Sequence, residues 1–191
     1  MLIKDVLTLA ADNLGRLDLQ SMITSAYNAA VSSGAIPTGE TALLLRCYRL
    51  VENEVALDHL PLKAEENLSP TQGYLNFSTF SRPPVDVLYV RDTQGREVDF
   101  EVFPERLRVK DGTGTLVIGY NYSPEEKNID KKTAFSDKVS ARLLSFGVAS
   151  EYLLTCGRYA EAAVWNEKFH EALRAAGLFR RKLCVRARRW V

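Results

Sequence analysis

The chain has 191 residues, of which 46% are hydrophobic, and its 25 Lys and Arg against 24 Asp and Glu give a formal net charge of +1. This size and composition suit one globular domain, or one domain with an inserted subdomain. No run approaches the ~20 apolar residues that a membrane-spanning helix needs. The near-neutral sum conceals an asymmetry. Residues 172–191 carry seven basic residues and no acidic one, so the first 171 residues hold 18 basic and 24 acidic residues, a net charge of −6.

The N-terminal segment MLIKDVLTLAADNLG lacks the apolar run and the small-residue cleavage site of a signal peptide. We therefore expect the protein to begin near Met1 and to work inside a cell or in a particle assembled there. The cysteines and histidines of the sequence are few and widely spaced, at Cys47, Cys156, Cys184, His59 and His170. A zinc site needs about four clustered nitrogen or sulfur ligands. We therefore expect free, mostly buried thiols and no metal site.

Apolar residues recur at helical spacing in the first third of the chain, which predicts helices over about 3–14, 18–33 and 40–57. Asp18 is a candidate N-cap of the second helix, and breaks rich in glycine or proline separate the helices. The third helix has a wide apolar arc, which is typical of a central helix that packs on more than one side.

Between about residues 70 and 125 the apolar period falls toward two, which predicts a small antiparallel sheet of about four strands. Asp92–Gly95 and Asp111–Gly114 have the composition of turns, and Pro83–Pro84 keeps its neighbours off an interior ladder. The strands are expected over 85–90, 97–103, 107–109 and 115–122, with an earlier candidate over 75–79.

Two further helices are expected after the polar connector 123–130. The first has a candidate N-cap at Ser136, with Asp137 favourable to the helix dipole. Gly157 separates it from the second, and so short a connection predicts an antiparallel αα-hairpin. The order of elements predicts an α+β fold rather than an alternating βαβ fold.

In full, we expect a mainly helical core, a helical bundle with a C-terminal αα-hairpin, that carries a small inserted antiparallel β-sheet and an extended basic C-terminal tail. The core would be a single domain over residues 1–177, with the β insertion at about 70–125. The tail would span residues 178–191.

No arrangement of catalytic residues is recognisable in the sequence. Gly112-Thr-Gly114 lacks the third glycine of a dinucleotide-binding fingerprint and the Lys-Ser/Thr of a phosphate-binding loop. The carboxylate pairs Glu65–Glu66 and Glu125–Glu126 are expected in solvated loops, without the distinct environments that general acid–base catalysis needs. We therefore expect no enzymatic activity and no cofactor.

The last residues combine cations with apolar side chains, and three interpretations remain open. The tail binds nucleic acid through its arginines and Trp190, docks on a protein through apolar anchors between the cations, or is merely a solvated basic terminus. We favour docking, because an acidic body repels DNA and disordered termini are usually poor in apolar residues. The expected partner-binding residues are Leu178, Phe179, Arg180, Arg181, Lys182, Leu183, Val185, Arg186, Arg188, Arg189 and Trp190.

Three segments together resemble the head–tail connector (adaptor) proteins of tailed bacteriophages. The resemblance covers roughly residues 40–176 and consists of helix and strand patterns rather than catalytic signatures. The second helix and the Ala-Ile-Pro-Thr-Gly break after it depart from short members of the family. The segments are Leu50-Val-Glu-Asn-Glu-Val-Ala-Leu57 with Pro61-Leu-Lys-Ala-Glu65, the stretch 85–122 ending in Ser123-Pro-Glu-Glu126, and Val139-Ser-Ala-Arg-Leu-Leu-Ser-Phe-Gly-Val-Ala-Ser-Glu-Tyr152 with Tyr159-Ala-Glu-Ala-Ala-Val-Trp165.

The resemblance implies a structural virion protein, made in the host cytoplasm, with a helical core and a small β insertion. It implies a homo-oligomeric ring, usually dodecameric, below the portal protein at the neck of the virion. Downstream tail or neck proteins would attach below this ring, and double-stranded DNA would pass through its bore without sequence-specific binding. The C-terminal segment of this family commonly reaches the portal, a role that residues 178–191 match by position and character. The alternative is a DNA-binding accessory protein that uses the arginine-rich C-terminus.

Overall fold

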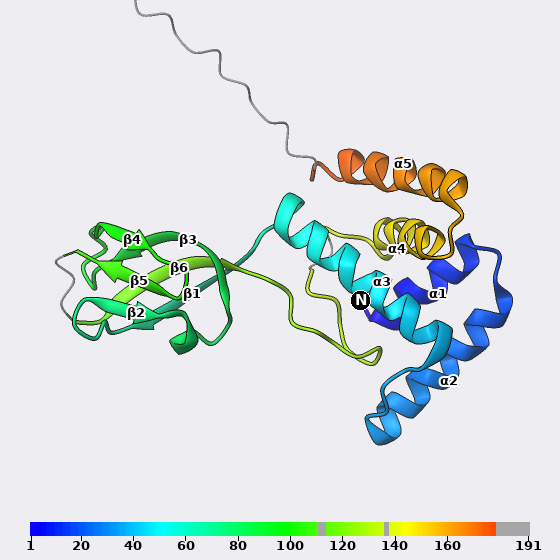
Figure 1. Ribbon diagram of the computed structural model, residues 1–191, viewed down its shortest axis with the longest axis horizontal. Coiled ribbons are helices and arrows are strands. Elements are labelled where there is room, and N and C mark those ends of the chain that lie inside the picture. Colours follow the sequence, from blue (N-terminus) through cyan, green and yellow to red (C-terminus); the bar gives the residue numbers. More distant parts are fainter. Residues whose placement is uncertain (111–113, 136–137, 179–191) are drawn as a thin grey trace, which may run out of the picture. The chain divides into compact units, whose positions relative to one another are not determined.

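A computed structural model of the chain describes residues 1–110, 114–135 and 138–178. These residues form five α-helices and two small antiparallel sheets, so the fold is mixed α+β as predicted (Figure 1). The chain divides into a helical unit, Met1–Glu52 with the chain from Lys127 onward, and a β unit, Asn53–Glu126. No helix within the described residues is long and apolar enough to cross a membrane.

The helical unit is built on apolar stripes at helical spacing. Helix α1 packs against α2 and α4, and α4 packs against α5. The side chains of Leu7, Leu44, Tyr48 and Phe169 are among those completely removed from solvent. The helices are α1 (Ile3–Asn13), α2 (Leu17–Ser33), α3 (Gly39–Glu54), α4 (Ala141–Thr155) and α5 (Tyr159–Ala175).

Three of these helices come close together at Gly147. A Cβ atom placed on this α4 residue would lie 2.7 Å from Cγ1 of Val51 in α3 and 3.2 Å from Cδ2 of Phe169 in α5. Side-chain carbons rarely come so close, and interiors have few voids into which they can shift. The missing side chain therefore lets α4 sit against both neighbours.

The segment that follows Lys127 is fastened to the N-terminus. Ile3 N donates to Lys131 O at 3.0 Å, and Thr133 N donates to Met1 O at 3.1 Å. Glu52 of α3, of which only 2% is exposed, accepts hydrogen bonds of 2.6 Å from the hydroxyl of Tyr48 and from the backbone N–H of Ala134. A buried carboxylate must be hydrogen-bonded to be tolerated, and the bond from Ala134 holds the segment on α3.

Two predicted helix caps are wrong. Asp18 lies inside the first turn of α2, whose N-cap is Arg16, and its carboxylate binds the Arg16 guanidinium at 2.6 Å. Helix α4 begins at Ala141, and its N-cap is Ser140, whose Oγ accepts from Leu143 N at 3.1 Å. The predicted cap at Ser136 lies outside the described residues.

The described residues of the β unit form six strands in two sheets, so the prediction of one sheet of about four strands is wrong. One sheet has the order β1–β6–β3 and the other β2–β5–β4, all pairs antiparallel. A π-helical turn (Val55–His59) and a 3₁₀ turn (Phe77–Thr79) flank the first strands. The strands are β1 (Leu62–Leu68), β2 (Tyr74–Asn76), β3 (Pro84–Arg91), β4 (Phe100–Val102), β5 (Arg106–Val109) and β6 (Leu116–Tyr122).

Both sheets of the β unit contribute to one apolar core. Alternating side chains supply it, such as Leu107 and Val109 of β5 and Ile118 and Tyr120 of β6. Pro84 begins β3, which among the named strands pairs with β6 alone and is therefore an edge strand of its sheet. The expectation that the proline pair lies off an interior ladder is confirmed.

Candidate functional site

The described chain ends in a capped helix terminus at the root of the predicted docking tail. Gly177 adopts a left-handed φ of 69°, and Leu178 N donates to Leu173 O at 2.9 Å. This geometry is typical of a helix C-terminus closed by glycine. Leu178, the first residue predicted to bind a partner, is only 8% exposed. The other predicted residues, Phe179, Arg180, Arg181, Lys182, Leu183, Val185, Arg186, Arg188, Arg189 and Trp190, lie outside the described residues.

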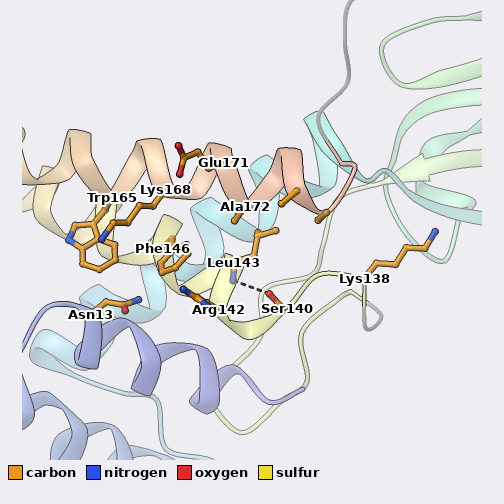
Figure 2. Close-up of a pocket in the computed structure, with 12 residues that line it drawn as sticks. Asn13, Lys138, Ser140, Arg142, Leu143, Phe146, Trp165, Lys168, Glu171 and Ala172 are labelled. Atoms are coloured by element: carbon orange, nitrogen blue, oxygen red, sulfur yellow. Dashed lines mark hydrogen bonds between the residues drawn. The ribbon is translucent and has the colours of Figure 1, made fainter.

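A groove of about 830 Å³ lies beside this terminus, and we call it the α4–α5 groove (Figure 2). Most of its wall comes from the first turns of α4 and from the second half of α5, and Asn13 at the end of α1 closes one side. The apolar lining residues are Leu143, Phe146, Trp165, Ala172, Ala175 and Ala176, and the polar ones are Asn13, Lys138, Ser140, Arg142, Lys168 and Glu171.

Two cations lie over the aromatic side chains of the groove. The ammonium of Lys168 is 4.0 Å from the ring centre of Trp165, and the guanidinium carbon of Arg142 is 5.5 Å from that of Phe146. The two rings are themselves 5.7 Å apart. Figure 2 shows these four side chains projecting from α4 and α5 into the same space. Cation–aromatic contacts of this kind hold long side chains in place at a surface.

The groove combines an apolar floor with a cationic rim. Lys138, Arg142 and Lys168 oppose a single lining acid, Glu171. This excess of positive charge favours a ligand with negatively charged groups, and the aromatic side chains favour apolar contacts with it. Sequence reasoning missed this site. The available signal was the spacing of Arg142 with Phe146 and of Trp165 with Lys168, one helical turn apart.

One of the two predicted carboxylate pairs of the β unit, Glu65–Glu66, does not lie in a loop. Glu65 and Glu66 lie on β1 rather than in a solvated loop. Glu66 accepts hydrogen bonds from the backbone N–H and hydroxyl of Ser81 and from the hydroxyl of Tyr120. Burial opposes ionisation of Glu66, but these hydrogen bonds and the charge of Arg82 outweigh it and lower the pKa of its carboxyl. The second pair, 125–126, lies in a loop as predicted.

The cysteines and histidines do not gather into a site in the described part of the chain. Cys47 is buried and Cys156 is exposed, so the expectation of mostly buried thiols holds for one of the two described cysteines. Cys184 lies outside the described residues. Burial raises the pKa of the Cys47 thiol to about 11, which disfavours the reactive thiolate. Among the described residues, no group of three or more His, Cys, Asp or Glu side chains is placed to hold a metal ion.

Neither a protein-family model nor a curated protein matches the chain.

Proposed function

We propose that this protein is a structural virion protein, a head–tail connector of a tailed bacteriophage. Its copies form an oligomeric ring below the portal, dock on the portal through the C-terminal tail and provide the platform to which the tail attaches. In this proposal the helices form a bundle, α4 and α5 pair as an αα-hairpin, and residues 178–191 extend as the basic docking segment.

The observation that carries this proposal is the position of the β unit. A compact antiparallel unit, residues 53–126, interrupts a helical unit between α3 and α4. A helical core with a small β insertion is what the resemblance to the connector family implies. The β unit begins within the first of the segments on which the resemblance rests, contains the second and ends before the third.

The distribution of charge supports the same proposal. Residues 53–126 hold 13 acidic and 7 basic residues, whereas residues 1–52 and 127–171 together hold 11 of each. The excess negative charge of the body therefore resides in the β unit. Like charge keeps DNA from adhering to a wall that it must slide past, so the β unit is the part suited to line a DNA passage.

The test is a truncation that ends at Leu178, since this residue is buried and completes the cap of α5. The truncated chain is expected to fold with an unchanged circular dichroism spectrum but to lose attachment to portal-containing particles. A matched variant with the six tail cations at 180–182, 186, 188 and 189 replaced by Gln separates the role of charge from that of the apolar anchors. Attachment by the truncated chain at the level of the intact chain would contradict the proposal.

The intact chain and the chain truncated at Leu178 also test the DNA alternative. A tail that binds DNA predicts retardation of duplex DNA by the intact chain, weakening steeply as salt rises and absent after truncation. Imaging of virions or of co-expressed portal gives an independent readout, because the connector proposal requires a ring at the portal vertex.

A further inference from the structure

Helix α2 leaves most of its surface in solvent and is unusually free of charge. Its buried residues are Leu19, Ile23 and Ala30, which lie on one face at helical spacing. No charged residue occurs from Leu19 to Gly39, although 26% of the chain is charged. The centres of protein interfaces are depleted of charged residues, so the exposed face of α2 is a candidate contact surface.

Five exposed residues form a stripe on the side of α2 away from its buried face. They recur at intervals of four and three residues, which is the spacing of a helix seam that packs against another helix. Large apolar side chains lie at its two ends, where Leu17 is 74% and Val31 is 60% exposed. We call this set the α2 stripe: Leu17, Ser21, Thr24, Asn28 and Val31.

The α2 stripe is complementary to itself when a second copy runs antiparallel to it. Its positions are symmetric about Thr24, so a two-fold axis at this residue sets Leu17 opposite Val31 of the second copy, and Ser21 opposite Asn28. Each apolar end then meets an apolar end. The hydroxyl of Ser21 donates to a backbone carbonyl of its own helix at 2.8 Å, so its oxygen can still accept from the amide of Asn28.

The charges beside the α2 stripe suit the same arrangement. Gln20 and Tyr27 lie seven residues apart, and therefore on the same side of the stripe. Gln20 donates to the carboxylate of Asp12, and the ammonium of Lys4 is 4.6 Å from the ring centre of Tyr27. The two-fold axis places the first half of one α2 beside the second half of the other. The acid of one copy therefore comes level with the cation of the other at both ends of the contact.

We propose that two copies of the chain pair through their α2 stripes, as antiparallel helices related by a two-fold axis at Thr24. The contact requires a partner with the same spacing and without charge, and α2 of a second copy supplies both. A helix of 17 residues is about 25 Å long, so the contact buries less than the ~800 Å² per partner of a standard interface. We therefore expect a weak dimer, with a Kd of about 10–100 µM.

This contact goes beyond the proposed ring. A two-fold contact joins the same surface of both copies and is complete in a dimer, whereas neighbours in a larger ring meet through different surfaces. The inference therefore describes the free protein before assembly, in addition to the contacts that would close a ring.

Sedimentation velocity of the full chain, from micromolar concentration to about 0.5 mM, tests the pairing. We expect a monomer–dimer equilibrium that salt changes little, because the α2 stripe carries no charge. Thr24→Glu and Thr24→Lys each set like charges opposite each other across the axis, and each should weaken the dimer by at least about tenfold. Asn166→Glu and Asn166→Lys, at an exposed position of α5, are the matched controls and should leave it unchanged.

Mixing the two Thr24 variants gives a sharper result. Residue 24 meets residue 24 only if the axis passes there, so the equimolar mixture should form a one-to-one dimer that rising salt weakens. Val31→Ser adds no charge but removes both apolar contacts, and should weaken the unchanged dimer by about tenfold. A full chain that is monomeric at every concentration overturns the inference, and so do association that none of these variants weakens and a mixture that stays monomeric.

A different partner for the α2 stripe would be recognised in the same experiments. If the free chain is monomeric and Thr24→Glu abolishes attachment to portal-containing particles, the stripe binds another protein and the inference is wrong. Failure of the proposed function has a separate signature. A dimer with the expected variant pattern, together with attachment that survives tail truncation, would sustain the inference and contradict portal docking through the tail. A monomeric chain that attaches through its tail would do the reverse.

Discussion

The helical unit and the β unit differ in how deeply their multiply hydrogen-bonded carboxylates, Glu52 and Glu66, are buried. In the helical unit a carboxylate, Glu52, is buried in the core and accepts hydrogen bonds from Tyr48, one helical turn before it, and from Ala134 in a distant part of the chain. In the β unit the polar contacts of Glu65, Glu66 and Tyr89 lie at a partly exposed sheet. A buried contact cannot be replaced by water when a partner is removed, whereas an exposed one can. Single substitutions should therefore affect the helical unit more than the β unit.

The largest expected effect comes from Glu52→Ala. This change leaves the hydroxyl of Tyr48 and the N–H of Ala134 without their acceptor in a buried position, which should lower the free energy of unfolding by about 3 kcal/mol. Urea unfolding followed by far-UV circular dichroism measures the loss. Glu167→Ala, on the exposed face of α5, is the matched control, and equal stabilities of the two variants would contradict the role assigned to Glu52.

Gly147→Ala tests the close contact of α3, α4 and α5. Alanine gains about 1 kcal/mol of helix propensity over glycine, but its Cβ would lie 2.7 Å from Val51 in a packed core. Overpacking costs about 1–3 kcal/mol, so we expect a net loss of about 1 kcal/mol in unfolding free energy. Adding Val51→Ala makes room for the new methyl group, and the double variant should lose less than the sum of the single changes. A more stable Gly147→Ala chain would refute the packing argument.

The same substitution in the β unit, Gly119→Ala, should cost less. Its Cβ would lie 2.3 Å from the ring of Tyr89, a closer clash than at residue 147. The ring is partly exposed, so it can turn away and give up its hydrogen bond to Glu65. We expect a loss below about 1 kcal/mol, comparable with an exposed polar contact. In a Tyr89→Ala background the penalty should vanish, and thermal unfolding of the four chains checks this.

The smallest expected effect is on the decline of stability at acidic pH. The pKa of Glu66 is lowered in the folded chain from a reference value of 4.5. The carboxylate thus stabilises the fold fully above that reference value, and its contribution is lost as pH falls through the lowered value. Unfolding curves between neutral and acidic pH should show a shallower decline for Glu66→Gln than for the unchanged chain. Parallel declines would rule out Glu66 as a source of acid sensitivity.

The helices were predictable because each buries one face, and the local sequence shows the resulting helical spacing of apolar residues. Their starts were less predictable. Asp18 and Ser140 are both suitable N-cap residues, yet only the second caps a helix, because Arg16 binds the Asp18 carboxylate. Arg16 lies only two residues before Asp18, but the spacing of the sequence does not show that the Asp18 carboxylate binds Arg16 instead of capping the helix.

Strand β1 and the groove could not be predicted, for a common reason. The alternation of Leu62, Ala64 and Leu68 is interrupted by Glu66, an acid at an inward-facing position of β1. Its partners Ser81 and Tyr120 come from distant parts of the chain. The groove likewise joins side chains from α1, α4 and α5. Contacts between distant segments leave no period in the sequence, so they emerge only from the folded chain.

The fastening of the N-terminus to residues 131–133 has a consequence for the order of folding during synthesis. The β unit is one continuous stretch, 53–126, and can fold as soon as its last strand leaves the ribosome. Helix α1 must wait for α4, against which it packs more than a hundred residues later. Contacts of such separation form slowly because a long loop must close first. The newly made chain therefore carries a finished β unit while its first helices still await their partners, and this interval is when it most needs protection from aggregation.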